Sequence, residues 1–150
     1  MEIVQIGTVH SPYTEIGQIP LCAVDRLEEV AVVEVFHEYS DGLQDLEGFS
    51  HVMLIVHMHR AEGVKLRVLP PIDDQVRGVF ATRSPMRPNH LGVSVVELLK
   101  LEGCDLVVKG IDLLDGTPLV DIKPFTSYDI QTPIRIGWLE GKTRQGKALR

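Results

Sequence analysis

Short runs in which apolar and polar residues alternate recur along the chain and predict β-strands. Residues 2–9 alternate in this way, while residues 30–36 (VAVVEVF) and 51–57 (HVMLIVH) are almost continuously apolar. Alternation is typical of a strand with one buried face, whereas a short apolar run rich in β-branched residues is typical of a fully buried strand. We therefore expect a half-buried first strand and two well-buried strands, of which 51–57 is central.

The second half of the chain continues this pattern. Further strands are predicted at residues 65–69, 78–82, 93–101, 106–114, 118–122 and 134–139. Asp115-Gly116 is a strong turn signal before one of them. One short helix is expected over residues 39–46, where leucines recur three apart behind Ser40 as an N-cap. Many short strands with little helix predict a mainly β fold, either a single antiparallel β-barrel domain with one or two short helices or a compact sandwich.

The composition fits one domain in a reducing compartment. A chain of 150 residues is long enough to bury roughly two-thirds of its unfolded surface. Its apolar runs stay well short of the roughly 20 residues that cross a bilayer, so no membrane partner is expected. Cys22 and Cys104 have no C-x-x-C partner, which favours a reduced, cytoplasmic chain. We place the domain at residues 1–140 and a basic tail at residues 141–150.

The net charge of −6 restricts how the protein can bind nucleic acid. An acidic protein does not attract phosphates through its overall field, so RNA binding would need a local basic patch. One such patch lies around Arg77, Arg83 and Arg87, and the other is the tail, which carries no acidic residue. The alternative for the tail is a solvated, frayed terminus.

The main candidate for a ligand-binding segment is residues 77–92, RGVFATRSPMRPNHLG. It begins as a predicted strand and continues into a loop in which Pro85 and Pro88 exclude helix and central strand. A rigid, cationic loop is suited to holding an anion or a flat polar ligand in place. The alternative is a proline-stiffened surface connector with solvated arginines.

The sequence gives less support to other candidate sites. His57 and His59 would share a strand face as a metal pair, but no third and fourth ligand is evident, so we expect no metal. A triad of Ser84, His90 and Asp121 lacks the G-x-S-x-G elbow. Asp121 and Lys123 point to one face of a strand, either as a structural ion pair or as ligand-orienting groups. The chain has neither a G-x-G-x-x-G motif nor a P-loop.

Four blocks together resemble a known family. They are IGTVHSPY (6–13), LEGFSHVMLIVHMHR (46–60), RGVFATRSPMRPNHLGVSVVELL (77–99) and GIDLLDGTPLVDIKPF (110–125). In this order they resemble the TsaA-like family, whose characterised members are TrmO-type tRNA methyltransferases. The resemblance implies a single β-barrel that binds S-adenosyl-L-methionine as a homodimer. It also implies methylation of N6-threonylcarbamoyladenosine next to the anticodon of tRNA.

The resemblance also implies site residues. The cofactor-binding residues would be Gln18, Ile19, Pro20, His59, Arg60, Arg83, Val93, Gly116, Thr117, Pro118, Leu119 and Lys123. Asp121 would accept the proton of the reacting amine, or a hydrogen bond from the cofactor ribose, and Arg83 would pair with the cofactor carboxylate. Arg87 and Asn89 would contact the tRNA, with Lys123 as a further phosphate contact.

Two other classes of function use the same pocket. One is a methyltransferase that acts on another adenosine or on a small molecule. The other is a non-catalytic barrel that binds a nucleoside as a binding or sensing module. Transfer of the methyl group to tRNA separates these functions from the one that the resemblance implies.

Overall fold

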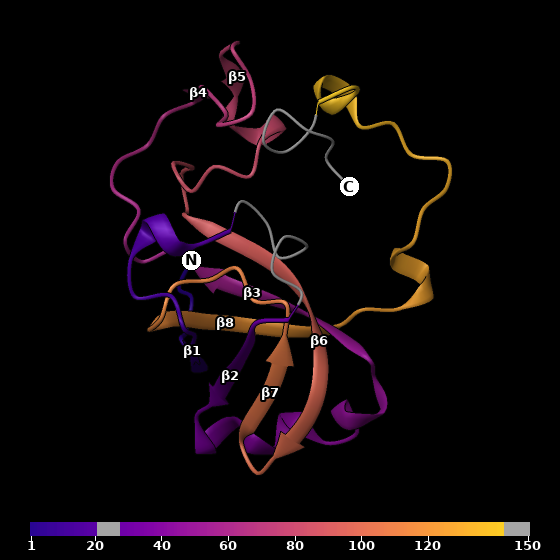
Figure 1. The fold of residues 1–150 in the computed structure, drawn as a ribbon. Coiled ribbons are helices and arrows are strands. Elements are labelled where there is room, and N and C mark those ends of the chain that lie inside the picture. Colours follow the sequence, from indigo (N-terminus) through magenta and orange to yellow (C-terminus); the bar gives the residue numbers. More distant parts are fainter. Residues whose placement is uncertain (21–27, 143–150) are drawn as a thin grey trace.

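The computed structural model describes residues 1–20 and 28–142, and its centre is a closed barrel (Figure 1). Six strands form it in the order β1-β2-β7-β6-β3-β8, and each neighbouring pair is antiparallel. The strands are β1 (Gly7–His10), β2 (Val30–Val35), β3 (His51–His57), β6 (Leu91–Glu102), β7 (Asp105–Lys109) and β8 (Thr117–Pro124). The prediction of a mainly β, antiparallel barrel is confirmed. Cys22 and residues 143–150 of the predicted tail lie outside the described residues.

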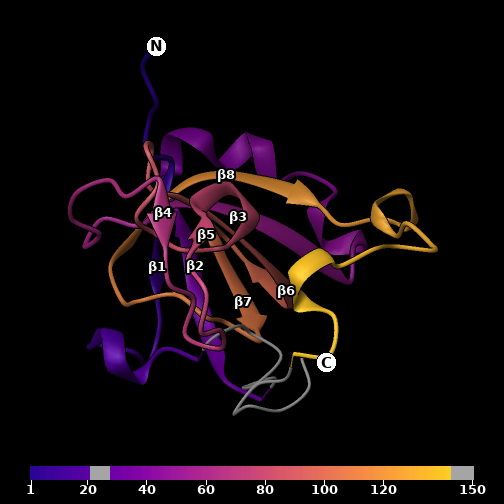
Figure 2. The same ribbon diagram turned by 90° about the horizontal axis from the view of Figure 1, so that it is seen from above.

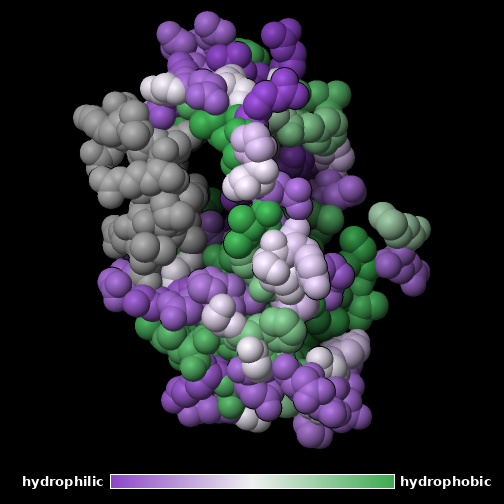
Figure 3. All heavy atoms as spheres, turned by 90° about the vertical axis from the view of Figure 1, so that its right-hand side faces the viewer, coloured by the Kyte–Doolittle hydropathy of each residue, from purple (hydrophilic) through white to green (hydrophobic). Residues whose placement is uncertain are grey.

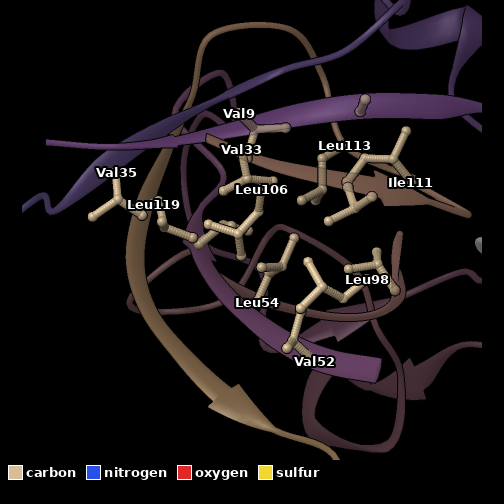
Figure 4. Packing of buried hydrophobic residues seen from close by; sticks show 14 of the residues in the cluster. Val9, Val33, Val35, Val52, Leu54, Leu98, Leu106, Ile111, Leu113 and Leu119 are labelled. Atoms are coloured by element: carbon tan, nitrogen blue, oxygen red, sulfur yellow. The ribbon is translucent and has the colours of Figure 1, made fainter. Parts of the chain in front are cut away.

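Alternate residues of the barrel strands point inward and fill the interior (Figure 4). In β3, Val52, Leu54 and Val56 are fully buried, while the residues between them lie on the outer face and are partly exposed. β3 pairs with β6 on one side and with β8 on the other, so both of its edges are covered, as they are for every strand of a closed barrel. The valine- and leucine-rich runs thus form strands because both their pairing edges and their inner face are covered.

Three predicted strands are clearly shorter than the sequence indicates. The strand predicted at residues 65–69 comprises only Arg67 and Val68. The first strand of the chain begins at Gly7 rather than at residue 2, and Ile3 and Val4 are 50% and 58% exposed. The predicted strand 106–114 ends at Lys109, because Gly110 takes a left-handed conformation (φ +86°) and turns the chain. The following apolar residues, Ile111, Leu113 and Leu114, are buried without being part of a strand.

The predicted helix over residues 39–46 is two 3₁₀ segments, η3 (His37–Leu43) and η4 (Leu46–Gly48). Asp45, in the left-handed conformation (φ 68°), interrupts them. Leu43 and Leu46 are buried in the barrel core, so these turns cover one end of the barrel. The leucine spacing therefore predicted correctly that Leu43 and Leu46 are buried, although the segment is not one α-helix.

A second, smaller unit stands away from the barrel (Figures 1 and 2). It contains the two-stranded sheet of β4 (Arg67–Val68) and β5 (Arg77–Gly78). The predicted strand 78–82 is wrong, because η5 (Val79–Ala81) turns the chain directly after β5. The backbone N–H of Thr82 closes this turn on the carbonyl of Val79.

The predicted strand 134–139 is also wrong. Its apolar residues Ile134 and Ile136 are 65% and 41% exposed, and the chain forms η7 (Gly137–Leu139). In the part of the chain that the structure describes, the other 3₁₀ turns are η1 (Ile16–Gln18) and η6 (Ser127–Asp129). Among the described residues, the structure contains no helix of the length and apolar character needed to cross a membrane.

Candidate active site at one rim of the barrel

Loops from four strands meet at one rim of the barrel. β3 ends there, and its residue Val56 lies opposite both Gly92 near the start of β6 and Leu119 near the start of β8. Val9, near the end of β1, lies opposite Thr117 at the start of β8. This rim consequently carries the segments that follow β1 and β3 and those that precede β6 and β8. All four segments contain residues that the sequence predicted for the cofactor.

Residues 82–90, which we call the arginine loop, are held by their own side chains. Thr82 Oγ1 donates to the Val79 carbonyl (2.8 Å) and accepts from the Ser84 backbone N–H (3.2 Å). Ser84 Oγ accepts from the Met86 N–H (3.2 Å). Such short-range hydroxyl–backbone bonds stabilise turns, so the loop is ordered by more than its two prolines.

The two arginines of this loop have different surroundings. Arg83 is exposed. Arg87 is half-buried and donates to the carbonyls of Thr82 (3.4 Å) and Val79 (3.3 Å). Arg83 therefore presents its guanidinium outward, while part of the donor capacity of Arg87 holds the loop.

His90 ends the arginine loop in a left-handed conformation (φ 47°), which costs energy in a residue with a side chain. Its Nδ1 lies 2.8 Å from the Pro85 carbonyl. Because a carbonyl only accepts, Nδ1 carries the proton. The rings of His90 and His57 lie edge to face, 6.2 Å apart. These contacts fix where the loop enters β6.

His59 and Arg60 lie in the exposed turn that follows β3. The Met58 N–H donates to the His90 carbonyl (2.8 Å), which ties this turn to the end of the arginine loop. Partial burial lowers the pKa of His59, and the neighbouring Arg60 and His57 lower it further. The lowered pKa favours the neutral ring at pH 7, so that Arg60 supplies the positive charge of this turn.

The turn before β8 exposes only part of the predicted set. Gly116 takes the left-handed conformation (φ +76°) and, with Pro118, lies at least partly at the surface. Thr117 is buried and its hydroxyl donates to the Leu114 carbonyl (2.6 Å). Leu119 is fully buried in the core. A ligand at this turn would therefore contact Gly116 and Pro118, and the side chains of Thr117 and Leu119 shape the turn from inside.

The loop after β1 is attached to this turn. The Ser11 N–H donates to Asp115 Oδ1 (3.0 Å), and the Asp115 N–H donates to the Tyr13 carbonyl (2.7 Å). Further along the same loop, Gln18 Oε1 accepts from the backbone N–H groups of Thr14 and Glu15. Ile19 and Pro20 follow, partly buried. The predicted residues 18–20 thus belong to a loop that is fastened to the rim.

Asp121, Lys123 and Val93 lie on the outer face of the barrel. Ile55 of β3 pairs with Val93 of β6 on one side and with Asp121 of β8 on the other, so these three form one row across the sheet. Neighbouring strands lie roughly 4.8 Å apart, which puts Val93 and Asp121 about 10 Å from each other. A ligand on this face would contact an apolar side chain and a carboxylate.

The ion pair predicted between Asp121 and Lys123 is present, with Oδ2 and Nζ 3.2 Å apart. Asp121 Oδ1 also accepts from the Ile122 N–H (2.9 Å). Both side chains are largely exposed, so the pair contributes little to stability. Together, Lys123 and the Ile122 N–H hold the Asp121 carboxylate in one orientation.

Two hollows include predicted site residues. One, of about 510 Å³, lies between η3–η4 and β8, toward the rim at which β8 ends, and includes Asp121 together with Tyr39 and Phe49. The other, of about 320 Å³, is lined by Phe80, Arg87, Pro88, Asn89 and Leu91. The structure therefore places the predicted proton acceptor and the predicted tRNA contacts in different hollows.

The structure does not form the hydrolytic triad considered from the sequence. Ser84, His90 and Asp121 are engaged in separate hydrogen bonds, with Met86, Pro85 and Ile122 respectively. In the part of the chain that the structure describes, no group of three or more His, Cys, Asp or Glu side chains is placed to hold a metal ion.

Sequence reasoning missed two aromatic residues near the arginine loop. The sequence pattern predicts Phe80 in a strand, but its side chain is 75% exposed at the hollow of Arg87 and Asn89. It predicts Trp138 in a strand as well, yet the indole N–H of Trp138 donates to the Ala81 carbonyl (2.7 Å). The hydroxyls of Thr82 and Ser84 were a local signal for the turn that exposes Phe80, whereas no local signal connects Trp138 to Ala81.

Comparison with known proteins identifies the family. A family model described as the tRNA-methyltransferase O N-terminal domain matches residues 8–129, well over half of the chain. The chain belongs to this family. The resemblance of its four sequence blocks is thereby confirmed.

Relatives of the tRNA-methyltransferase O family differ in length. A probable S-adenosyl-L-methionine-binding protein of Pyrococcus abyssi is 48% identical over 136 residues, which are 90% of this chain and 74% of the relative. A mouse tRNA (adenine(37)-N6)-methyltransferase is 40% identical over 129 residues, 83% of this chain but 28% of the mouse protein. The crystal structure of TrmO from Pseudomonas aeruginosa superposes with a TM-score of 0.79 at 36% identity, covering 91% of this chain and 61% of that one. The mouse and Pseudomonas proteins thus contain parts that this match does not cover.

Proposed function

We propose that this protein transfers the methyl group of S-adenosyl-L-methionine to the N6 position of N6-threonylcarbamoyladenosine beside the anticodon of tRNA. Family membership supports an S-adenosylmethionine-dependent tRNA methyltransferase. The observation that carries the proposal is the meeting of four predicted cofactor segments at one barrel rim, although they are far apart in sequence.

The residues at the rim fit the chemistry of the cofactor. Arg83 and Arg60 are exposed cations that suit its carboxylate, and a planar guanidinium makes two parallel hydrogen bonds to such a group. Val93 is 53% exposed and offers an apolar surface to the adenine ring. The left-handed Gly116 leaves the backbone of its turn accessible to a ligand.

Bound S-adenosyl-L-methionine supplies an activated methyl group on a sulfonium. The protein contributes mainly by alignment, since orientation of two reactants alone can supply several kcal/mol. Asp121 is proposed to accept a hydrogen bond from the reacting amine and to take its proton as the new bond forms. In this proposal, the ion pair with Lys123 keeps the Asp121 carboxylate in a fixed orientation.

The tRNA is proposed to contact the arginine loop. Asn89 and Phe80 line the same hollow as Arg87, which combines a hydrogen-bonding amide, an aromatic ring and a cation. This combination suits an unstacked base and its phosphate. Lys123, whose side chain is 61% exposed, is a second phosphate contact in this proposal.

We further propose a cytoplasmic homodimer, as the resemblance to the family implies. Large apolar side chains such as Leu66 and Ile134 are 62% and 65% exposed in the single chain. Figure 3 shows apolar residues (green) at the surface among hydrophilic ones (purple). A second copy of the chain would cover part of this apolar surface.

The test is incubation of the purified protein with labelled S-adenosyl-L-methionine and total tRNA, prepared with and without the threonylcarbamoyl modification. We expect label only in the modified tRNA. Cofactor binding is measured in parallel by calorimetry. Label in both tRNA pools would indicate another acceptor, and binding without any transfer would indicate a non-catalytic binding protein; either result contradicts the proposal.

A further inference from the structure

The segment after β8 crosses the molecule and ends on the smaller unit. β8 ends at Pro124 on the rim opposite the candidate site, and the chain then runs outside the barrel to η7, beside β4 and β5 (Figures 1 and 2). We call residues 125–142 the arm. Its apolar side chains at Ile130 and Ile134 are 62% and 65% exposed, so burial of these side chains does little to hold it.

Four residues, which we call the clasp, fasten the end of the arm: Asp73, Arg77, Trp138 and Lys142. Asp73 Oδ1 accepts from Lys142 Nζ (2.8 Å), and Oδ2 accepts from Arg77 Nε (2.7 Å). The guanidinium of Arg77 in turn lies 5.3 Å from the centre of the Trp138 ring, within range of a cation–π interaction. The clasp thus joins two segments that lie some sixty residues apart in sequence.

The carboxylate of Asp73 is closed off by these partners. Its side chain is 0% exposed, whereas those of Arg77 and Lys142 keep 25% and 33% of their surface. The hydrogen bonds from Lys142 and Arg77 hold the pKa of Asp73 well below its usual range. The carboxyl group of Asp73 is therefore ionised at neutral pH.

The clasp reaches the arginine loop through Trp138. The indole N–H donates to the carbonyl of Ala81 (2.7 Å), two residues before Arg83. Ala81 ends η5, whose first carbonyl, that of Val79, accepts bonds from Thr82 and Arg87. Trp138 consequently holds the base of the loop from outside, and the internal bonds of the loop continue from that point.

We propose that the clasp positions the arginine loop and that Trp138, acting through Ala81, sets the orientation in which Arg83 receives the carboxylate of the cofactor. The inference rests on the proposed function, because it needs the cofactor to bind at Arg83. A loop released from the clasp must be ordered again on binding. The cost of ordering one such side chain on binding corresponds to an affinity lower by roughly five- to tenfold.

The test compares Trp138→Phe with Tyr128→Phe in the full chain. Trp138→Phe keeps a ring over Arg77 and removes the N–H that binds Ala81. Tyr128→Phe removes a hydroxyl from an exposed aromatic ring of the same arm, outside the clasp, and serves as the matched control. Asp73→Asn is the second variant, because it removes the charge that both cations share.

Two measurements are needed. Calorimetry gives the dissociation constant of S-adenosyl-L-methionine. Hydrogen exchange follows the backbone N–H of His90, which donates to the backbone carbonyl of Arg87 within the loop (3.1 Å). We expect Trp138→Phe and Asp73→Asn to weaken cofactor binding roughly five- to tenfold and to speed exchange in the loop but not in β3. Where transfer is measurable, KM for the cofactor should rise while kcat stays the same.

The inference is wrong if Trp138→Phe binds the cofactor as tightly as the unsubstituted protein does, whether or not hydrogen exchange in the arginine loop is faster. Equal losses in Tyr128→Phe would overturn it too, because the effect would then belong to the arm as a whole. If the unsubstituted protein does not bind the cofactor, the proposed function fails instead. Loop exchange alone then decides whether the clasp positions the loop.

Discussion

Arg83 and Arg87 stand four positions apart in the same loop and have different tasks in the structure. The Arg87 guanidinium donates to two carbonyls of its own loop, whereas Arg83 is exposed and near the rim. Sequence alone does not separate them, since Arg83 follows Thr82, Arg87 follows Met86, and each stands near a proline. Their difference depends on how η5 folds back toward the loop.

Replacing Arg83 by Ala is expected to remove measurable binding of S-adenosyl-L-methionine while leaving the fold intact. The side chain is exposed, so its removal should leave the fold unchanged. A lost bidentate pair with a carboxylate costs about 2–3 kcal/mol, or roughly a hundredfold in affinity. Calorimetry measures the affinity and circular dichroism the fold. Arg67→Ala is the control, because Arg67 is an exposed arginine of the same small unit. Affinity unchanged from that of the unsubstituted protein would remove Arg83 from the site.

At the scale of elements, β6 presents two leucines in a row to opposite surroundings. Leu98 is 9% exposed and packs in the core, and Leu99 is 45% exposed on the outer face. A strand separates neighbouring side chains in this way because its side chains alternate between faces. The pair therefore measures how much the barrel interior contributes to stability.

Leu98→Ala is expected to lower the free energy of unfolding by about 2–4 kcal/mol, because it removes buried methyl groups and leaves a cavity. Leu99→Ala removes the same atoms from a partly exposed position and should cost less than about 1 kcal/mol. Urea unfolding, followed by circular dichroism, measures both. Similar losses for the two variants would mean that the outer face of β6 is also buried in solution, as in a dimer.

The sequence predicted the barrel strands well where alternation or a buried apolar run decided the matter, as in residues 30–36 and 51–57. It failed where apolar residues are exposed or buried without strand pairing. Ile134 and Ile136 are exposed in the arm, and Ile111 and Leu113 are buried beyond the end of β7. Hydrophobicity predicts neither outcome, because each depends on whether a neighbouring strand edge is available.

The candidate site was predictable in part for a related reason. Prolines, arginines and a D-G turn are local features, and they marked the arginine loop and the turn before β8. The hydrogen bond from Trp138 to Ala81 and the burial of Asp73 link segments far apart in sequence. Only the fold brings such residues together.

The whole molecule depends on the contact between its first and last barrel strands. β1 closes the barrel between β2 and β8, and Gly7 lies opposite Val35 on one side and Leu119 on the other. A Cβ at Gly7 would lie 2.1 Å from the Glu34 carbonyl oxygen and 3.1 Å from Leu119 Cδ2. The strands meet closely there because residue 7 has no side chain.

Gly7→Ala is expected to lower the free energy of unfolding by about 3 kcal/mol, because backbone atoms of β2 must move to admit the methyl group. Gly42→Ala is the control, since a Cβ at Gly42 meets nothing within 4 Å. Urea unfolding of both variants measures the difference. A loss below about 1 kcal/mol for Gly7→Ala would show that the closure between β1 and β2 is looser than the structure indicates.

The pairing of β1 with β8 also affects how the protein folds as it leaves the ribosome. Gly7 pairs with Leu119, and synthesis of the intervening chain takes roughly ten seconds at about 5–20 residues per second. During that interval β1 has only one of its two barrel neighbours, and one edge of the nascent sheet stays open. Chaperone binding or pairing with another nascent chain would compete for that edge until β8 emerges.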